Sequence, residues 1–497
     1  MSDRGAKSVW ALTFGLALVV VPLLMWPGQM YDGGRMSLAA RENDLSGFWL
    51  FAGRAGWEAQ FGLLWIENLL ADLLGVEFRA LDLVVGVFAV ALVAWETGRI
   101  AEGALSLPSH FRAATMLVTL AFPAWQVLAS SIHTFHVLCV GVGLLGVRYF
   151  VTASSAARRA TGFLLVIVGM QLSSSLVLLP VVALVWHNPT ACRSRGAGRS
   201  KRVLLASIML FLGRRILFPN EEPYEDYNVF INPFTSFGVR DYAENVAGYS
   251  SLIIPPLSLV VLVGFALGGR SAISSAVRSR TLIGPGLMTV GGVAPYVLVG
   301  KSANFRGFGE VVDWLFRHTF TMGPGLALLV STLVFETSLG VRSPRRFVTI
   351  ATAACVLILA VPSLVGGLSK AGRRHFEIDL ATALLSASVD LPPGRVVVSG
   401  EGVPFPKFRP DEANWWSWDR LGRRDLWFEI GSEASGRGME IPEVSKRSEQ
   451  LDLAFEGVGG STCVTEVELD ISGYGPLSTL KAGAGSHLSI RSMSTTC

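Results

Sequence analysis

The chain has few charged residues. Only 16% of its 497 residues are Asp, Glu, Lys or Arg, whereas 51% are hydrophobic. A soluble globular protein carries about 25% charged residues, so this composition indicates a polytopic membrane protein. Most basic residues of the first 368 positions lie in short connections between apolar runs, where they set orientation, and no basic stretch is interleaved with aromatic residues. Nucleic-acid binding is therefore not expected.

Cysteine is also scarce, and its spacing excludes common zinc and redox motifs. The five cysteines form no C-x-x-C pair and no zinc-ligand pattern. Cys139 and Cys355 lie in apolar runs, and Cys192 lies in a basic connection. Cys463 and Cys497 share the C-terminal segment, where a disulfide is permitted if that segment lies outside the cytoplasm. The sequence leaves this disulfide open, and no motif supports a divalent cation or another cofactor.

The first long apolar run predicts a transmembrane helix. Residues 9–26 hold 18 positions without a formal charge, which as a helix of roughly 1.5 Å rise per residue nearly cross a ~30 Å hydrocarbon layer. Arg4 and Lys7 precede the run, so the positive-inside rule places the N-terminus in the cytoplasm. No small-residue cleavage site follows, which predicts an uncleaved anchor and an outer loop that begins near Met30.

Further apolar runs predict about nine full spans. After the first run they cover residues 81–95, 113–128, 133–147, 203–219, 252–267, 282–298, 320–335 and 348–365. Residues 161–186 lie between two basic segments and are interrupted at 171–175, which predicts a broken hairpin of two short halves. The basic connections fall on one side, so we expect a multi-pass inner-membrane protein with a cytoplasmic N-terminus and an extracytoplasmic C-terminus.

The expected fold is an all-α polytopic membrane domain with a small β-rich extracytoplasmic domain. The first covers residues 1–368, with outer loops at 28–79, 220–250 and 300–318, and the tail covers 369–497. Residues 47–75 are predicted to form an amphipathic helix along the outer surface. In the α+β tail, a helix over 376–389 precedes strands near 395–399, 425–430, 451–456, 462–470 and 487–491.

Three acidic residues beyond the first span are candidate catalytic groups. They are Asp32, Glu42 and Asp44. A carboxylate at the outer membrane surface can deprotonate an acceptor hydroxyl, or bind a metal that neutralises a phosphate leaving group. The alternative is simple solvation, because any outer loop contains Asp and Glu.

Two sets of cationic residues are candidates for binding a lipid-linked phosphate. Arg214 and Arg215 lie at the outer end of a predicted span, and guanidinium groups match phosphate oxygens. Snorkelling to lipid head groups is the alternative for this pair. The second set surrounds an amphipathic outer segment and comprises Lys301, Arg306, Arg317 and His318. Ordinary anchoring of an interfacial helix explains this set equally well.

Two further groups have both a functional and a structural interpretation. Trp415, Trp416 and Trp418 form a cluster of the kind that stacks on the sugar rings of an acceptor, or that packs the core of a small domain. His133 and His136 are i, i+3 neighbours on one helix face. They have no obvious third ligand, so polar helix packing is favoured over a metal site.

The layout resembles the GT-C superfamily of integral-membrane glycosyltransferases. The shared features are a cytoplasmic N-terminus, an acidic first outer loop with surface helices, broken spans and an extracytoplasmic C-terminal domain. The resemblance implies a polyprenyl-phosphate or polyprenyl-pyrophosphate sugar donor. It also implies a catalytic or metal-binding carboxylate in the first outer loop, a role that falls to Asp32, or to Glu42 and Asp44. The 415–419 segment is similar to the WWDYG signature of oligosaccharyltransferases but has other residues in the places of its Asp, Tyr and Gly, so no peptide-recognition role follows.

These observations favour a glycosyltransferase that moves a sugar from a polyprenyl-phosphate-linked donor to a glycan, lipid or protein acceptor on the outer face. A polymerase-type or non-catalytic protein of cell-envelope polysaccharide assembly, which would dock other envelope-assembly proteins, is the alternative. A transporter is a third possibility, although the sequence shows neither the internal repeat nor the midplane charges typical of that class.

Overall fold

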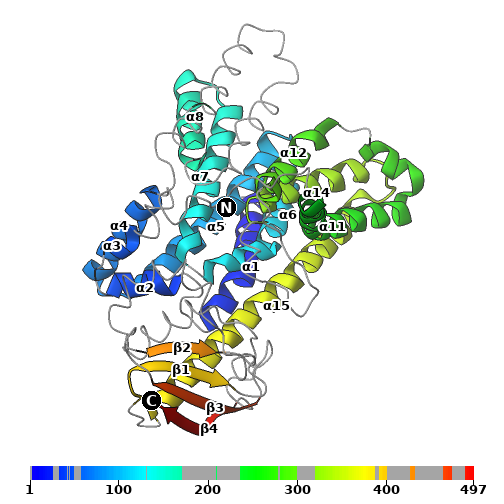
Figure 1. Cartoon of the computed structure of the whole chain (residues 1–497). Coiled ribbons are helices and arrows are strands. Elements are labelled where there is room, and N and C mark those ends of the chain that lie inside the picture. The colour runs from blue at the N-terminus through cyan, green and yellow to red at the C-terminus, as the bar shows by residue number, and fades with distance from the viewer. Residues whose placement is uncertain are drawn as a thin grey trace.

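The computed structural model shows a bundle of helices followed by a small sheet (Figure 1). It describes residues 3–25, 33–41, 43, 45–49, 58–129, 131–170, 209, 236–277, 280–298, 319–386, 391–399, 426–430, 463–472 and 487–497. The prediction of a helical domain followed by a small C-terminal β domain is confirmed. The predicted span at 203–219, apart from Met209, and the second half of the predicted hairpin lie outside the described residues.

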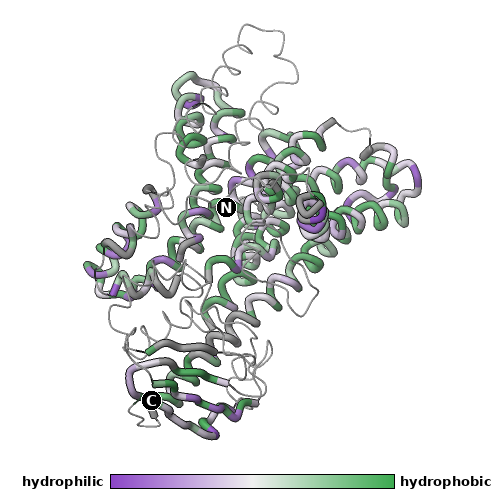
Figure 2. The backbone as a smooth tube through the Cα atoms, in the orientation of Figure 1, coloured by the Kyte–Doolittle hydropathy of each residue, from purple (hydrophilic) through white to green (hydrophobic). Residues whose placement is uncertain are grey.

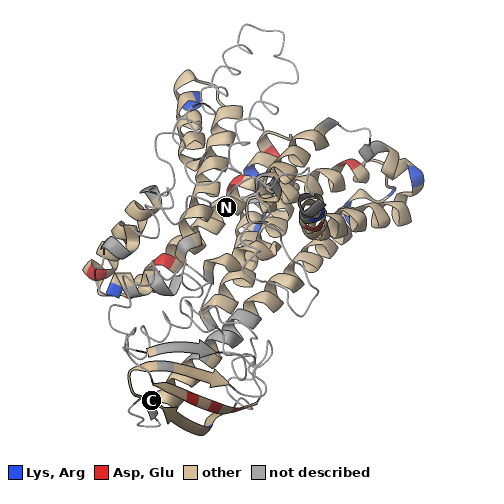
Figure 3. Cartoon of the chain, in the orientation of Figure 1, with Lys and Arg blue, Asp and Glu red and all other residues tan. Residues whose placement is uncertain are grey.

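Within the described residues, five helices contain a stretch long and apolar enough to cross a membrane. They are α1 (Asp3–Met25), α5 (Phe78–Gly103), α7 (Thr134–Val151), α11 (Ser236–Val277) and α15 (Pro344–Ser386). Their backbones are coloured mainly as hydrophobic in Figure 2, and charged residues are sparse along them in Figure 3. Each covers one of the predicted apolar runs to within one residue, because an apolar run is compatible with both helix formation and hydrocarbon.

Other predicted spans are shorter or interrupted. The run at 113–128 forms α6 (His110–Ala121) and then the 3-10 helix η2 (Pro123–Ala129), because Pro123 cannot donate the backbone hydrogen bond that would continue α6. The run at 282–298 forms α12 (Ile283–Gly291) and α13 (Ala294–Leu298). The other described helices of the bundle are α8 (Ala156–Met170), η6 (Arg280–Leu282) and α14 (Met322–Ser338).

Glycines set the close packing of α7 against α8. A side chain at Gly162 would place its Cβ 2.5 Å from the backbone nitrogen of Phe150. A side chain at Gly146 would place its Cβ 2.6 Å from the backbone nitrogen of Val166. Small residues let two membrane helices approach in this way without a hydrophobic driving force.

Three short helices lie beside the bundle at the end where the sheet is found (Figure 1). They are α2 (Gly33–Arg41), α3 (Leu45–Phe48) and α4 (Glu58–Leu74). A small apolar core joins them to the start of α5 through Met36, Phe48, Leu64 and Phe78. The helix α2 also contacts the 3-10 helix η3 (Ser131–His133), which precedes α7.

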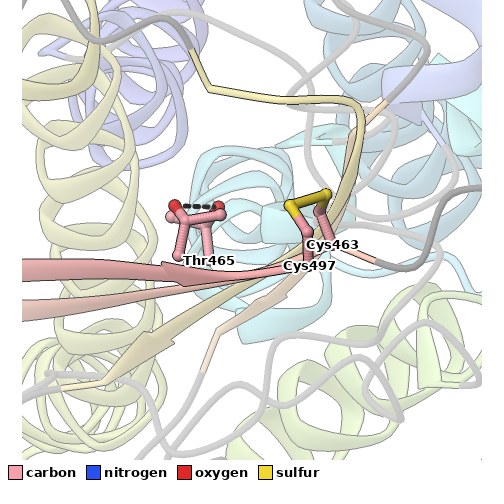
Figure 4. The surroundings of a disulfide bond; sticks show 4 residues. Cys463, Thr465 and Cys497 are labelled. Atoms are coloured by element: carbon pink, nitrogen blue, oxygen red, sulfur yellow. Dashed lines mark hydrogen bonds between the residues drawn. A yellow bond between two sulfur atoms is a disulfide. The ribbon is translucent and has the colours of Figure 1, made fainter.

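The C-terminal sheet has the strand order β2-β1-β3-β4. The strands are β1 (Gly394–Ser399), β2 (Leu426–Ile430), β3 (Val464–Ser472) and β4 (His487–Thr496). The strand β1 pairs in parallel with β2 and β3, and β3 pairs antiparallel with β4. A disulfide between Cys463 and Cys497 joins the start of β3 to the end of β4, next to the hydrogen-bonded pair Thr465 and Thr495 (Figure 4).

The helix α15 is continuous from the bundle to the sheet. Its apolar stretch ends at Leu368. Its last turns pack Phe376, Leu380 and Leu384 against apolar residues of β1 and β3. The domain boundary predicted at residue 369 therefore falls inside a helix, and residues 376–386 of the helix predicted at 376–389 are the end of α15. The predicted strand at 451–456 lies outside the described residues.

Candidate functional site

The residues proposed from the sequence as catalytic or binding groups lie outside the described residues. They are Asp32, Glu42, Asp44, Arg214, Arg215, Lys301, Arg306, Arg317, His318, Trp415, Trp416 and Trp418. Their roles remain predictions. In sequence, Asp32 directly precedes α2 and Glu42 directly follows it, and α2 contacts α5 and η3. The described residues next to α2 in the fold are therefore the relevant part of the bundle.

Asn43 connects the turn after α2 to the helix α4. Its side-chain Oδ1 accepts a hydrogen bond of 2.9 Å from Nδ2 of the buried Asn68. The backbone of Asn43 has φ 53°, a left-handed conformation that Asn adopts more readily than most residues. The turn is closed by a hydrogen bond of 3.2 Å from the Asn43 backbone N–H to the Ala40 carbonyl. Asn43 is thus attached to α4 at Asn68, the residue that follows Glu67 in the sequence.

A buried ion pair lies in the first turn of α5. Nη1 of Arg79 lies 2.5 Å from Oδ2 of Asp82, and both residues are buried. Nη2 of Arg79 donates a second hydrogen bond of 2.5 Å to the carbonyl of Leu128 in η2. Two charges removed from water require such partners, since an isolated buried charge costs several kcal/mol. Arg79 therefore holds Asp82 and η2 together at this end of the bundle.

Glu67 faces this ion pair from the inner side of α4. It is 2% exposed, and neither of its carboxylate oxygens has a hydrogen-bond partner among the described residues. The pKa of Glu67 is raised to about 8, mainly by burial and also by the negative charge of Asp82, while the positive charge of Arg79 opposes the rise. At neutral pH the carboxyl is mostly protonated, and it can release or take up a proton near pH 8.

Two histidines complete the polar surroundings. His133 ends η3, and His136 lies in the first turn of α7. Their rings are 5.8 Å apart, and the ring of His136 lies 6.2 Å from that of Phe320. Within the described part of the chain, no three His, Cys, Asp or Glu residues are grouped so that they could hold a metal ion. We therefore assign no metal ligand, and aromatic and polar packing accounts for both rings.

We call the group formed by Asn43, Glu67, Asn68, Arg79 and Asp82 the polar cluster. It combines a proton-exchanging carboxyl, a permanently charged guanidinium and a second carboxylate in a place that excludes bulk water. A carboxyl with a raised pKa beside a charged pair can exchange a proton. The sequence-based prediction missed them as site residues. The sequence did contain a signal for them, which is charge inside an apolar helix: Glu67 in one helix, and Arg79 and Asp82 at positions i and i+3 in the next. Charged residues in such helices suggest a functional site by default.

The opposite end of the bundle carries a different set of charges. The pKa of His110 lies below its ordinary value because of partial burial and because Arg345 and Lys7 are close to it. Arg148 pairs with the buried Glu96, and the guanidinium of Arg112 lies 4.0 Å from the centre of the Trp95 ring. We call this the basic end. These contacts join α1, α5, α6, α7 and α15, and they have the simple explanation of fixing helix ends.

Comparison with known proteins gives a likeness in structure alone. No protein family and no curated protein matches the chain by sequence. Two crystal structures of ArnT from Cupriavidus metallidurans, a GT-C glycosyltransferase, resemble it at 14% identity. The form bound to undecaprenyl phosphate has a TM-score of 0.48 and covers 93% of this chain and 92% of that chain. For the apo form the TM-score is 0.49 and the shares are 94% and 93%.

At these TM-scores and this identity, the likeness carries no conclusion about fold, family or activity, and the function has to be inferred from the residues of this chain.

Proposed function

We propose that this chain is an integral-membrane glycosyltransferase that moves a sugar from a polyprenyl-phosphate-linked donor to an acceptor. The observation that carries the proposal is the hydrogen bond between Asn43 and Asn68. It joins Asn43, the residue between Glu42 and Asp44 in the sequence, to Asn68 of α4, which follows the buried Glu67. Carboxyls and a cation near a membrane surface are the groups that transfer from a lipid phosphate requires.

In this mechanism, Asp32, Glu42 or Asp44 orients the acceptor hydroxyl and removes its proton. The oxygen of that hydroxyl then bonds to the sugar carbon while the bond from this carbon to the donor phosphate breaks. Arg214, Arg215 or Lys301 stabilises the departing phosphate, with Arg306, Arg317 and His318 as further candidates. Trp415, Trp416 and Trp418 would contact the acceptor. The polar cluster supports the first outer loop, and Glu67 exchanges a proton there.

We place this chemistry on the extracytoplasmic side of the inner membrane. Lys7, His110 and Arg345 gather at the basic end, which the positive-inside rule assigns to the cytoplasm. The disulfide between Cys463 and Cys497 lies in the C-terminal sheet, at the end where α2–α4 are found (Figure 1). Disulfides persist in oxidising compartments. Both features support a cytoplasmic N-terminus and an extracytoplasmic tail.

The test is sugar transfer by purified protein in lipid nanodiscs, with a radiolabelled sugar on undecaprenyl phosphate and an envelope extract as acceptor. Loss of the catalytic base in Asp32→Asn, Glu42→Gln or Asp44→Asn should lower transfer by about 10²–10⁴-fold. Asp72→Asn is the matched control, because Asp72 is exposed on α4. Equal transfer by all variants would contradict catalysis by these carboxylates. Absence of transfer with sugar flux across proteoliposomes would indicate a transporter.

A further inference from the structure

Three helices of the bundle meet near their starts at the basic end. The helices α1, α6 and α15 contact one another in pairs. Close to its start, each has a buried residue that packs it into the bundle, and these residues are Ser8, Phe111 and Phe347. The beginnings of the three helices are therefore held in place by the fold.

The residues next to these buried positions are basic. Lys7, His110 and Arg345 come from three different helices, and all three side chains reach the surface. Partial burial and the positive charges of Arg345 and Lys7 lower the pKa of His110, so the three groups lie near one another, and we call them the basic triad. Neither α6 nor α15 has an acidic residue in its first turn, although an acidic residue commonly complements this end of a helix. Positive charge is thus concentrated where the three helices meet.

The surface that continues from the basic triad along α1 is apolar. The exposed residues Trp10, Phe14 and Val21 follow Lys7 at positions i+3, i+7 and i+14, which form one face of the helix. The neighbouring helix α15 exposes Leu357. Both helices are apolar and long enough to cross a membrane, so these side chains meet acyl chains. The basic triad therefore lies at the border between an acyl-chain surface and water, which is the level of lipid head groups.

We infer that Lys7, His110 and Arg345 bind the phosphate of an anionic phospholipid, whose acyl chains lie along Trp10 and Phe14 of α1. The guanidinium of Arg345 can donate to two phosphate oxygens, and the Lys7 ammonium and a ring N–H of His110 can donate to the others. Basic groups between membrane helices bind lipid head groups in this way. The site lies at the opposite end of the bundle from the polar cluster, so this inference does not depend on glycosyl transfer.

The experiment measures lipid binding by the full chain with native mass spectrometry in detergent. Wild type should bind phosphatidylglycerol at least about tenfold more tightly than phosphatidylcholine, whose choline group cancels the charge of its phosphate. Lys7→Gln/Arg345→Gln should weaken binding of phosphatidylglycerol by about 30-fold, the change expected of two cations that contribute about 1 kcal/mol each. Lys7→Gln and Arg345→Gln alone should each weaken it about fivefold, so poor folding of the double variant leaves two measurements.

The matched control is Arg158→Gln/Arg159→Gln, which removes two exposed arginines from α8. It should change the affinity for phosphatidylglycerol by less than about twofold, because salt screens exposed charges that lie at a distance from the lipid. Equal weakening by the two double variants would overturn the inference, and so would equal binding of both lipids by wild type. Inorganic phosphate that displaces phosphatidylglycerol at equal concentration would also overturn it, because the site would then take a free anion. The measurement detects lipid and not sugar, so its result is separate from that of the transfer assay.

Discussion

The guanidinium of Arg79 lies 2.5 Å from the carboxylate of Asp82, three residues later on α5, and Asp82 is completely buried. A second hydrogen bond from Arg79 reaches Leu128 in η2. The pair therefore joins two segments that are distant in sequence, and it determines much of the local stability around the polar cluster.

Replacing Arg79 should destabilise the protein strongly. Arg79→Met leaves the Asp82 carboxylate buried without its partner, so the free energy of unfolding should fall by about 3–5 kcal/mol. Thermal unfolding in detergent measures the loss, and the double variant Arg79→Met/Asp82→Leu should recover most of it. The matched control is Arg240→Met, because Arg240 and Glu244 form an exposed pair at 2.8 Å, and its effect should not exceed about 0.5 kcal/mol. If Arg79→Met and Arg240→Met lowered the free energy of unfolding equally, the assignment of Arg79 and Asp82 as a buried ion pair would be contradicted.

Glu67 should make stability depend on pH. Its pKa is raised from 4.5 to about 8 by burial and by Asp82, so the folded state holds a proton that the unfolded state has released. Stability should therefore fall as pH rises from about 5 to 8, by up to about 1.4 kcal/mol per pH unit from this group. Glu67→Gln keeps the shape and removes the titration. Unfolding curves of the wild type and of Glu67→Gln, compared at each pH in this range, give the contribution of Glu67 to the pH dependence of stability. If the free energy of unfolding changed with pH equally in both proteins, the prediction would be disproved.

The contact of α7 with α8 should not tolerate a methyl group. Gly162→Ala places a Cβ 2.5 Å from the Phe150 backbone nitrogen, so one helix must shift, at a cost of roughly 1–3 kcal/mol. The melting temperature in detergent should fall. Gly286→Ala is the control on α12, where an added Cβ meets no atom within 4 Å, and it should be neutral or slightly stabilising. A melting temperature unchanged by both substitutions would show that α7 and α8 pack differently.

The disulfide should stabilise the C-terminal sheet. Cys463 and Cys497 are 34 positions apart, and closing a loop of that length stabilises by about 3–4 kcal/mol in the chain-entropy description. Cys463→Ser/Cys497→Ser should make the tail more sensitive to proteolysis, whereas Cys139→Ser should leave this sensitivity unchanged. Alkylation with a maleimide polymer before and after reduction reports the bond directly. Labelling of both cysteines in unreduced protein purified from the membrane would contradict it.

The sequence predicted the described long helices well, because a run without charge has few alternatives in hydrocarbon. It predicted less where a single residue changes the local geometry. Pro123 divides one apolar run into α6 and η2. The strand order and the parallel pairing of β1 with β2 and β3 depend on contacts between distant residues, which alternation along a strand does not reveal.

The polar cluster likewise depends on contacts between helices that the sequence does not reveal. Glu67 and Asp82 stand out as charges within apolar helices, but nothing in their spacing shows that α4 folds against α5 and brings them close. The position of the outer-loop carboxylates after the first span predicts their catalytic role, and the transfer assay tests it.

The path of α15 has a consequence for how the protein can move. Composition changes near residue 369, yet the helix carries on to Ser386 and ends beneath the sheet. A continuous helix thus connects the bundle to the sheet, with no flexible linker between them. If the membrane-spanning part of α15 changes its tilt, the sheet has to change its position with it. A probe on the tail would therefore report motion that begins inside the bilayer.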